Sequence, residues 1–257
     1  MVSKEVQAEV RTHLAAIERE HDVRVLFACE SGSRAWGFAS PDSDFDVRFV
    51  YAHPRDWYLS IEQRRDVIDI PISGEMDIAG WDLRKALGLA RAGNATLSEW
   101  LDSPVIYKDH DDFAARMRSL LDATYRRERA FMHYTSLARN HFTESPSGKD
   151  RRLKRFLYSL RTALAAQWCA TREDRPPMTL YALTDALIDN ADVRARIDAL
   201  VELKSTLAEK SFYEPDAVVT EFLEHRIAAL ADAVVESAPA ADGAVFDRFF
   251  IGELERS

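Results

Sequence analysis

The sequence contains few cysteines and no long apolar segment. Cys29 and Cys169 are the only cysteines, too few for a disulfide framework or a cysteine-rich zinc site, so we expect a reducing compartment. No run approaches the roughly 20 apolar residues that a membrane-spanning helix needs. The first residues, Met1 to Glu5, include no apolar stretch of the kind found in secretory signals. These absences exclude small secreted and membrane-spanning classes, and they predict a cytoplasmic protein with no membrane partner.

An excess of positive charge is also missing. Lys and Arg total 34 against 43 Asp and Glu, which gives a formal net charge of -9. This balance argues against indiscriminate coating of a polyanion, although a local basic cleft stays open. With 257 residues, of which 47% are hydrophobic, the chain can bury a sizeable core as one large domain or two smaller ones.

The hydrophobic pattern changes character along the chain. A helical period covers residues 4–20, and short β-branched or alternating runs predict strands at 23–29, 45–51, 67–72, 75–80 and 105–107. From Asp82 onward the period is helical, apart from the last of these strands. We therefore predict an α+β fold: an N-terminal domain over residues 1–107, with a mixed sheet and flanking helices, and a C-terminal helical bundle over residues 108–257.

Two aspartates share one predicted strand. Asp44 and Asp46 are two residues apart, so a strand would place both carboxylates on one face. Such carboxylates repel each other unless a cation lies between them, and Mg²⁺ prefers oxygen ligands. Asp77, on a later predicted strand, supplies a third carboxylate. The three aspartates predict a two-metal Mg²⁺ or Mn²⁺ site with catalytic function. A lone Asp-x-Asp is more often a solvated strand edge. The metal-site prediction therefore depends also on Asp77 and on the Gly-Ser turn described next.

A small turn precedes this acidic strand. Gly32 and Ser33 follow the first predicted strand, and ten residues separate Ser33 from Asp44. Glycine allows an anion to approach the backbone closely, and serine adds a donor, so this turn is a candidate phosphate cradle. Arg34 and Arg48 are candidates to neutralise phosphate charge, since Arg48 falls on the face of the two aspartates.

These motifs resemble a known family. Gly32-Ser33, ten residues, and then Asp44-Phe-Asp46-Val, with a later acidic residue, resemble the signature of the DNA polymerase β nucleotidyltransferase superfamily. More narrowly, four stretches resemble the RlaP branch, which is associated with RNA repair and often found near RNA ligases: Gly32-Ser-Arg-Ala-Trp-Gly-Phe38, Ser40-Pro-Asp-Ser-Asp-Phe-Asp-Val-Arg48, Gly80-Trp-Asp-Leu-Arg-Lys85 and Leu97-Ser-Glu-Trp-Leu101. The resemblance implies the polymerase-β-like fold and nucleotidyl transfer.

A basic face occurs in the helical half. At 3.6 residues per turn, Arg151, Lys154, Tyr158 and Arg161 fall within about a quarter of the helix circumference, opposite a row of leucines. The resemblance implies that Lys154 and Arg161 contact the phosphates of a nucleotide, while Tyr158 packs on its sugar or base. A merely solvated face is the alternative. Trp36 and Phe38 are candidates either to cover the nucleotide or to pack locally.

The resemblance implies transfer of a nucleoside monophosphate from a nucleoside triphosphate, ATP among them, to an acceptor hydroxyl, with release of pyrophosphate. An RNA 3′ end, such as that of a tRNA, is the expected acceptor, and proteins of an RNA ligase pathway are expected partners. Two alternatives stay open: the acceptor is a protein or a small molecule, or the chain is a catalytically silent nucleotide-binding module.

Overall fold

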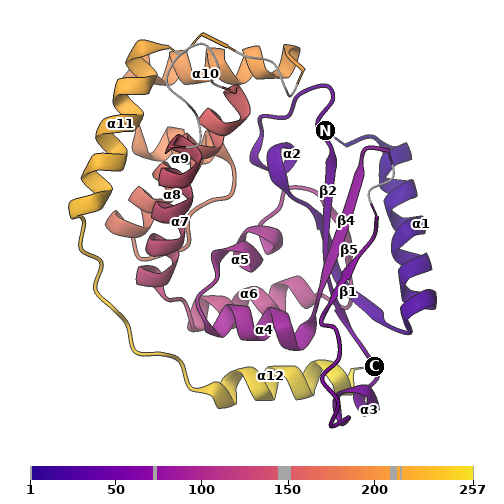
Figure 1. Ribbon diagram of the computed structural model, residues 1–257. Coiled ribbons are helices and arrows are strands. Elements are labelled where there is room, and N and C mark those ends of the chain that lie inside the picture. Colours follow the sequence, from indigo (N-terminus) through magenta and orange to yellow (C-terminus); the bar gives the residue numbers. More distant parts are fainter. Residues whose placement is uncertain (1, 72–73, 144–151, 209–212, 215, 257) are drawn as a thin grey trace. The chain divides into compact units, whose positions relative to one another are not determined.

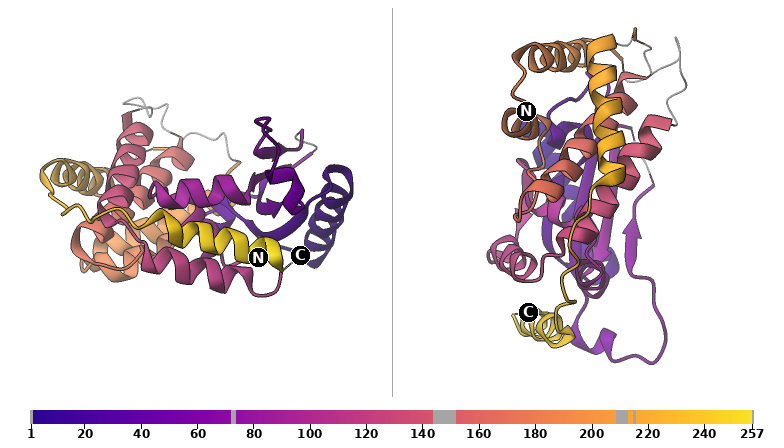
Figure 2. Two further views of the ribbon diagram at one scale, coloured as in Figure 1. Left: turned by 90° about the horizontal axis from the view of Figure 1, so that it is seen from below. Right: turned by 90° about the vertical axis from the view of Figure 1, so that its left-hand side faces the viewer.

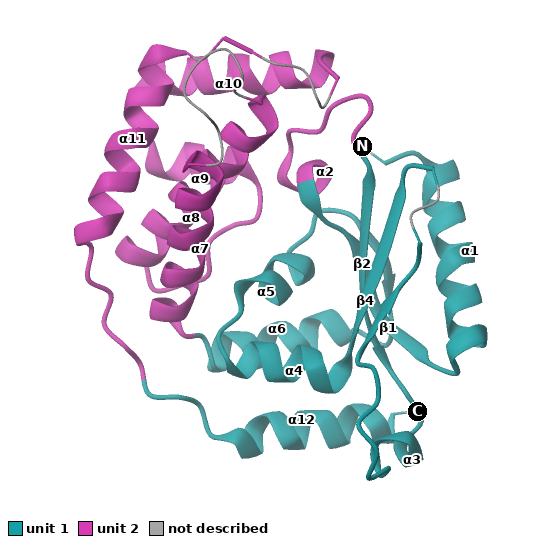
Figure 3. Cartoon of the chain, in the orientation of Figure 1, with its two compact units in different colours: residues 1–32, 44–125, 239–257 teal, residues 33–43, 126–238 magenta. Residues whose placement is uncertain are grey.

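The computed structural model (Figure 1) describes residues 2–71, 74–143, 152–208, 213–214 and 216–256. The chain forms two compact units, shown in two colours in Figure 3. Unit 1 contains residues 1–32, 44–125 and 239–257, and unit 2 contains residues 33–43 and 126–238. The boundary expected from the sequence, at residue 107, therefore falls inside unit 1. The sequence also did not predict that the loop 33–43 belongs to the helical unit 2, or that residues 239–257 belong to unit 1.

Unit 1 is built on a five-stranded mixed sheet, which confirms the predicted α+β class. The strands are β1 (Arg24–Glu30), β2 (Phe45–Ala52), β3 (Val67–Asp69), β4 (Met76–Asp82) and β5 (Ile106–Asp109). Their order is β3-β4-β2-β1-β5. Only the β2–β4 pair is parallel among these neighbours, and the other pairs are antiparallel. The apolar β-branched runs identified in the sequence form the central strands, since these are buried on both faces.

Helices cover both faces of the sheet in unit 1. On one face lies α1 (Lys4–His21), whose Val10, Leu14 and Ile17 pack in a core with Val47 and Ile78. The other face is covered by α4 (Leu83–Arg91), α5 (Ala95–Leu101), α6 (Phe113–Ala123) and α12 (Gly243–Glu255) (Figures 1 and 2). A short helix, α3 (Arg55–Tyr58), follows β2.

Cys29 lies in the core beneath the second group of helices, fully buried. Burial raises the pKa of its thiol well above the ordinary value. This placement agrees with a small core residue rather than a nucleophile.

Unit 2 is helical. It contains α7 (Arg127–Thr143), α8 (Leu153–Thr171), α9 (Leu180–Leu187), α10 (Ala191–Thr206) and α11 (Ala217–Asp232). The short α2 (Gly32–Trp36) begins in unit 1 and continues into unit 2. Helix α8 is central, because α7, α9, α10 and α11 all contact it. Side chains are accordingly buried around its whole circumference from Ser159 to Ala166. Within the described ranges, no helix has the length and apolarity needed to cross a bilayer.

Candidate functional site

Asp46 and Asp77 lie side by side on the two parallel strands. The register of β2 and β4 pairs Asp46 directly with Asp77. The alternate residues Val47 and Ile78 enter the core under α1, so both carboxylates belong to the opposite face of the sheet. The structure therefore brings together two of the three predicted acidic residues. Because β4 pairs with β2 directly, the intervening β3 does not separate them.

The guanidinium of Arg48 lies between these carboxylates. Its Nη2 atom donates to Oδ2 of Asp77 at 2.7 Å and to Oδ1 of Asp46 at 3.2 Å. Its Nη1 atom donates to the backbone oxygen of Asp77 at 2.9 Å. The three side chains are only 21%, 27% and 32% exposed, for Arg48, Asp46 and Asp77 respectively. A cation thus occupies the position between two facing anions, as electrostatics requires.

Asp44 stands at the edge of this arrangement. It is exposed and immediately precedes β2. Among the described residues, no group of three or more His, Cys, Asp or Glu side chains converges as a metal-binding set. The donor chemistry nevertheless fits a divalent cation, since two carboxylates face one positive centre. Asp46 and Asp77 are the pair that would hold it, and Asp44 remains a predicted further ligand.

Gly32 closes the site against Asp46. Its φ of 60° lies in the left-handed region, and a Cβ atom placed there would meet Oδ2 of Asp46 at 2.0 Å. Only glycine fits such an approach without displacing the carboxylate. The sequence predicted that this glycine lets an anion approach the backbone, and the anion that approaches it in the structure is the Asp46 carboxylate.

Ser33 and Arg34 hold the loop 33–43 together. The Ser33 hydroxyl is buried and donates to Ser43 Oγ at 3.3 Å, and Arg34 donates to the backbone oxygen of Ser43. The Ser40 amide donates to Ser43 Oγ at 2.9 Å. The predicted phosphate donors therefore make internal contacts of the loop, and their binding of phosphate stays a prediction.

Aromatic residues of the same loop pack on helix α8 within unit 2. The ring centroid of Tyr158 lies 4.7 Å from that of Trp36 and 5.6 Å from that of Phe38. Lys154, which is partly exposed, places its Nζ 5.7 Å from the centroid of the Tyr158 ring. The local-packing alternative for Trp36 and Phe38 is thus observed.

Arg161, which the sequence placed on a basic face of α8, is buried in the structure. This side chain is 2% exposed, its guanidinium carbon lies 4.4 Å from the Trp36 ring centroid, and its Nε donates to the Met178 oxygen at 2.8 Å. Surrounding elements bury this part of the helix on every side, which a single-helix projection cannot reveal. Arg151, predicted on the same face, lies outside the described residues.

Sequence reasoning missed Glu30, although it directly follows the predicted strand 23–29 and lies two residues before Gly32. The side chain is 0% exposed, and its Oε1 accepts a hydrogen bond from the Asp46 backbone amide at 3.0 Å. A charged residue closing an otherwise apolar run was the available signal.

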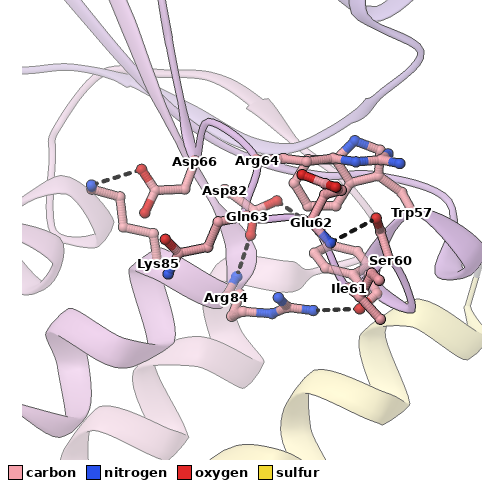
Figure 4. A pocket seen from close by; sticks show the side chains of 11 residues that line it. Trp57, Ser60, Ile61, Glu62, Gln63, Arg64, Asp66, Asp82, Arg84 and Lys85 are labelled. Atoms are coloured by element: carbon pink, nitrogen blue, oxygen red, sulfur yellow. Dashed lines mark hydrogen bonds and ion pairs between the residues drawn. The ribbon is translucent and has the colours of Figure 1, made fainter.

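A cavity of about 640 Å³ lies at the other ends of β2 and β4 (Figure 4). It contains none of the predicted site residues. Its charged residues include both signs, with Lys85 paired to Asp66 at 3.0 Å. The buried Asp82 accepts from the Tyr58 hydroxyl at 2.8 Å and from the Arg84 amide at 2.8 Å. Burial raises the pKa of the Asp82 carboxyl. With its charges balanced, this cavity indicates no particular ligand.

Paired aspartates on neighbouring strands, beside a glycine turn that fits closely against one of them, are the arrangement that the resemblance to nucleotidyltransferases predicts. A family model described as "RlaP: RNA repair pathway DNA polymerase beta family" matches residues 6–252. The chain belongs to this family.

Two individual proteins extend the comparison. The "Uncharacterized protein YcgL" of Bacillus subtilis (strain 168) is 38% identical over 223 residues, which make up 87% of this chain and 86% of that protein. Among solved structures, a nucleotidyltransferase-like protein from Exiguobacterium sibiricum 255-15 aligns over 97% of this chain and 78% of its own. That alignment has 10% identity and a TM-score of 0.33, so the site rests on the geometry above.

Proposed function

We propose that the protein is a metal-dependent nucleotidyltransferase, which transfers a nucleoside monophosphate from a nucleoside triphosphate to an acceptor hydroxyl and releases pyrophosphate. The observation that carries this proposal is the register of Asp46 with Asp77 around a single positive centre. Membership of the polymerase-β-type RNA repair family supports the same chemistry.

Each acidic residue has a distinct part in this proposal. In a two-metal site of Mg²⁺ or Mn²⁺, Asp44 and Asp46 would hold the ion that accompanies the triphosphate, and these two together with Asp77 would hold the catalytic ion. When bound, such ions polarise phosphoryl oxygens and stabilise both the attacking and the leaving oxygen. Asp77 accepts the proton of the acceptor hydroxyl or orients that hydroxyl. Positioning and charge neutralisation then supply most of the rate enhancement.

The cationic residues act on the triphosphate. Arg48 exchanges its contacts with the two aspartates for phosphate oxygens, because its planar guanidinium suits both kinds of anion. Gly32, Ser33 and Arg34 form the turn that receives the phosphates. Lys154 contributes a further positive charge, and Tyr158 offers a ring to the sugar or base. The burial of Arg161 supports a structural role for it instead, namely stacking on Trp36.

We propose RNA as the acceptor, on the strength of the family's description as an RNA repair pathway family. The net charge of -9 requires the RNA phosphates to meet a local basic surface rather than the molecule as a whole. Enzymes that reseal RNA, such as ligases, are the expected partners in that pathway.

The test is a label-transfer assay. The protein is incubated with each α-labelled nucleoside triphosphate, with Mg²⁺ or Mn²⁺, and with pooled tRNA. We expect label at RNA 3′ ends, and we expect Asp46→Asn and Asp77→Asn to abolish it while preserving the fold by circular dichroism. Label on protein or on a small molecule would keep the chemistry and overturn the RNA acceptor. Transfer that persists unchanged in both variants would refute the assigned site.

A further inference from the structure

Behind Asp46 lies a buried hydrogen-bonded pair, Glu30 and Tyr107. Glu30 is the last residue of β1 and is 0% exposed, while Tyr107 on β5 is 4% exposed. One carboxylate oxygen of Glu30 accepts from the Asp46 amide at 3.0 Å, and the other accepts from the Tyr107 hydroxyl at 2.5 Å. These hydrogen bonds connect β5, β1 and β2, running from Tyr107 through Glu30 to Asp46.

The backbone around Glu30 is also fixed. Its amide donates to the Val105 oxygen at 2.9 Å, and the Ser103 hydroxyl donates to its carbonyl oxygen at 2.6 Å. The β1–β2 ladder ends at the pair Glu30 and Val47. Beyond that pair the Ser31 amide still donates to the Asp46 backbone oxygen at 2.8 Å, while the Asp46 amide donates to the Glu30 side chain at 3.0 Å. The Glu30 carboxylate thus supplies the acceptor for the next amide of β2.

A bulge places Tyr107 at this point. In the β1–β5 pairing, Ala28 is opposite Lys108 and Cys29 is opposite Ile106, so the register passes over Tyr107. Bulges of this kind redirect one side chain and occur often beside active sites. Here the redirected hydroxyl meets the Glu30 carboxylate.

The buried Glu30 carboxylate is energetically unfavourable as a core-filling group. Burying a charged group costs free energy unless hydrogen bonds compensate for lost water, and an apolar side chain would fill the space at lower cost. The carboxylate does something that an apolar residue would not: it fixes the main chain of a residue whose carboxylate faces Arg48 and, across the strands, Asp77. Groups that orient a metal ligand from behind typically change metal affinity or activity by 10–100-fold when removed.

We propose that Glu30, held by Tyr107, is a positioning residue that fixes Asp46 for cation binding and nucleotidyl transfer. This inference rests on the proposed function for its catalytic part. Its metal-binding part is independent of any acceptor or nucleotide, because Mn²⁺ can be titrated into the protein alone.

The test compares three substitutions in the full-length chain. Glu30→Leu removes the acceptor for the Asp46 amide, Tyr107→Phe removes only the supporting hydroxyl, and Glu30→Gln retains an oxygen that can accept from Asp46. Mn²⁺ affinity without nucleotide is measured by electron paramagnetic resonance, and kcat and KM by label transfer.

We expect Glu30→Leu to weaken Mn²⁺ binding and lower kcat by roughly 10–100-fold each, with KM for the triphosphate little changed. Tyr107→Phe should show a smaller loss of the same kind, and Glu30→Gln should stay within about threefold of wild type, since one neutral hydrogen bond is at stake. The matched control is Glu253→Gln: that carboxylate is 4% exposed in unit 1 but pairs with Arg116. It should lower thermal stability without changing Mn²⁺ affinity.

Wild-type Mn²⁺ affinity in both Glu30→Leu and Tyr107→Phe would overturn the proposal. The proposal would also be overturned if Glu253→Gln, at the same Tm as these variants, showed the same losses of Mn²⁺ affinity and kcat. Such losses would reflect lower stability rather than a contact with Asp46. If Glu30→Leu fails to fold, Tyr107→Phe decides, because it retains the aromatic packing. If wild type transfers no nucleotide, the proposed function fails, whereas the Mn²⁺ titrations still decide the role of Glu30.

Discussion

Replacing Arg48 with methionine tests the electrostatics at the centre of the site. Arg48→Met keeps an aliphatic stem but leaves Asp46 and Asp77 facing each other without the guanidinium. A hydrogen bond to a charged group contributes about 1.5–3 kcal/mol net. Because these side chains are 21–32% exposed, we discount each contact to about 1 kcal/mol. Repulsion between carboxylates on strands about 4.8 Å apart adds a similar amount after screening.

The free energy of unfolding in metal-free buffer should therefore fall by about 2–3 kcal/mol. For a chain of this size, that corresponds to a Tm lower by roughly 5–10 °C. Added Mg²⁺ should restore more stability to the variant than to wild type, because in wild type the ion must displace the guanidinium. A ligand at 100 times its Kd stabilises by about 2.7 kcal/mol, enough to recover most of the loss. Differential scanning fluorimetry with and without Mg²⁺ measures both effects.

The matched control is Arg65→Met in the same unit. Arg65 pairs with Asp69 at 2.7 Å, but these side chains are 69% and 55% exposed, so its removal should change Tm by no more than 1–2 °C, equivalent to about 0.5 kcal/mol. An Arg48→Met variant that melts like wild type without metal, or that gains no more from Mg²⁺ than wild type, would refute the reasoning.

Three further predictions concern other residues. Gly32→Ala should lower label transfer at least tenfold, because the added Cβ displaces the Asp46 carboxylate. The control is Gly74→Ala, since Gly74 has a φ of 64° but no atom within 4 Å of an added Cβ. This control should lose only about 1–2 kcal/mol of unfolding free energy in chemical denaturation, the backbone cost of a positive φ. Asp82→Asn should gain stability relative to wild type as pH rises above about 4, the ordinary pKa of an aspartate carboxyl. Burial raises the pKa of the Asp82 carboxyl, so its favourable contribution is complete only at low pH and is lost as pH rises through the raised value; a pH-independent difference in urea titrations would contradict this. Arg161→Leu should destabilise unit 2 by about 2–3 kcal/mol, whereas Lys154→Ala should change stability by less than about 0.5 kcal/mol, and equal Tm values for these two variants would argue against the burial of Arg161.

Local pattern predicted much of unit 1. Apolar, alternating runs located all five strands within a few residues, because strands of a mixed sheet are specified by side-chain periodicity. The pairing of Asp46 with Asp77 could not be derived in the same way. It depends on β4 lying next to β2 while β3 occupies the edge, and strand order is a tertiary property that spacing does not encode.

The missed features share a physical cause. The burial of Arg161 follows from the four helices that contact α8 and from Trp36, and the contact of Glu30 with Tyr107 follows from a bulge in β5. Neither is visible in one segment of sequence, since each depends on contacts between residues far apart in the chain. The sequence left two alternatives for Trp36 and Phe38, covering a nucleotide or packing locally, and their packing on Tyr158 of α8 also joins residues far apart in the chain.

The last helix has a consequence for how the protein is made. Helix α12 packs Phe246 and Leu254 into the core beside α4, Glu253 pairs with Arg116 at 2.7 Å, and its backbone oxygen accepts from Arg24 at 3.2 Å. At about 5–20 residues per second, a ribosome adds the residues between 125 and 243 in roughly 6–24 seconds. During that interval the apolar surface beside α4 that Phe246 and Leu254 later cover stays exposed. Unit 2 is complete at residue 238 and can therefore finish folding before unit 1 does. Unit 1, although it begins at the N-terminus, folds last, and we expect a ribosome-associated chaperone to bind it in the meantime.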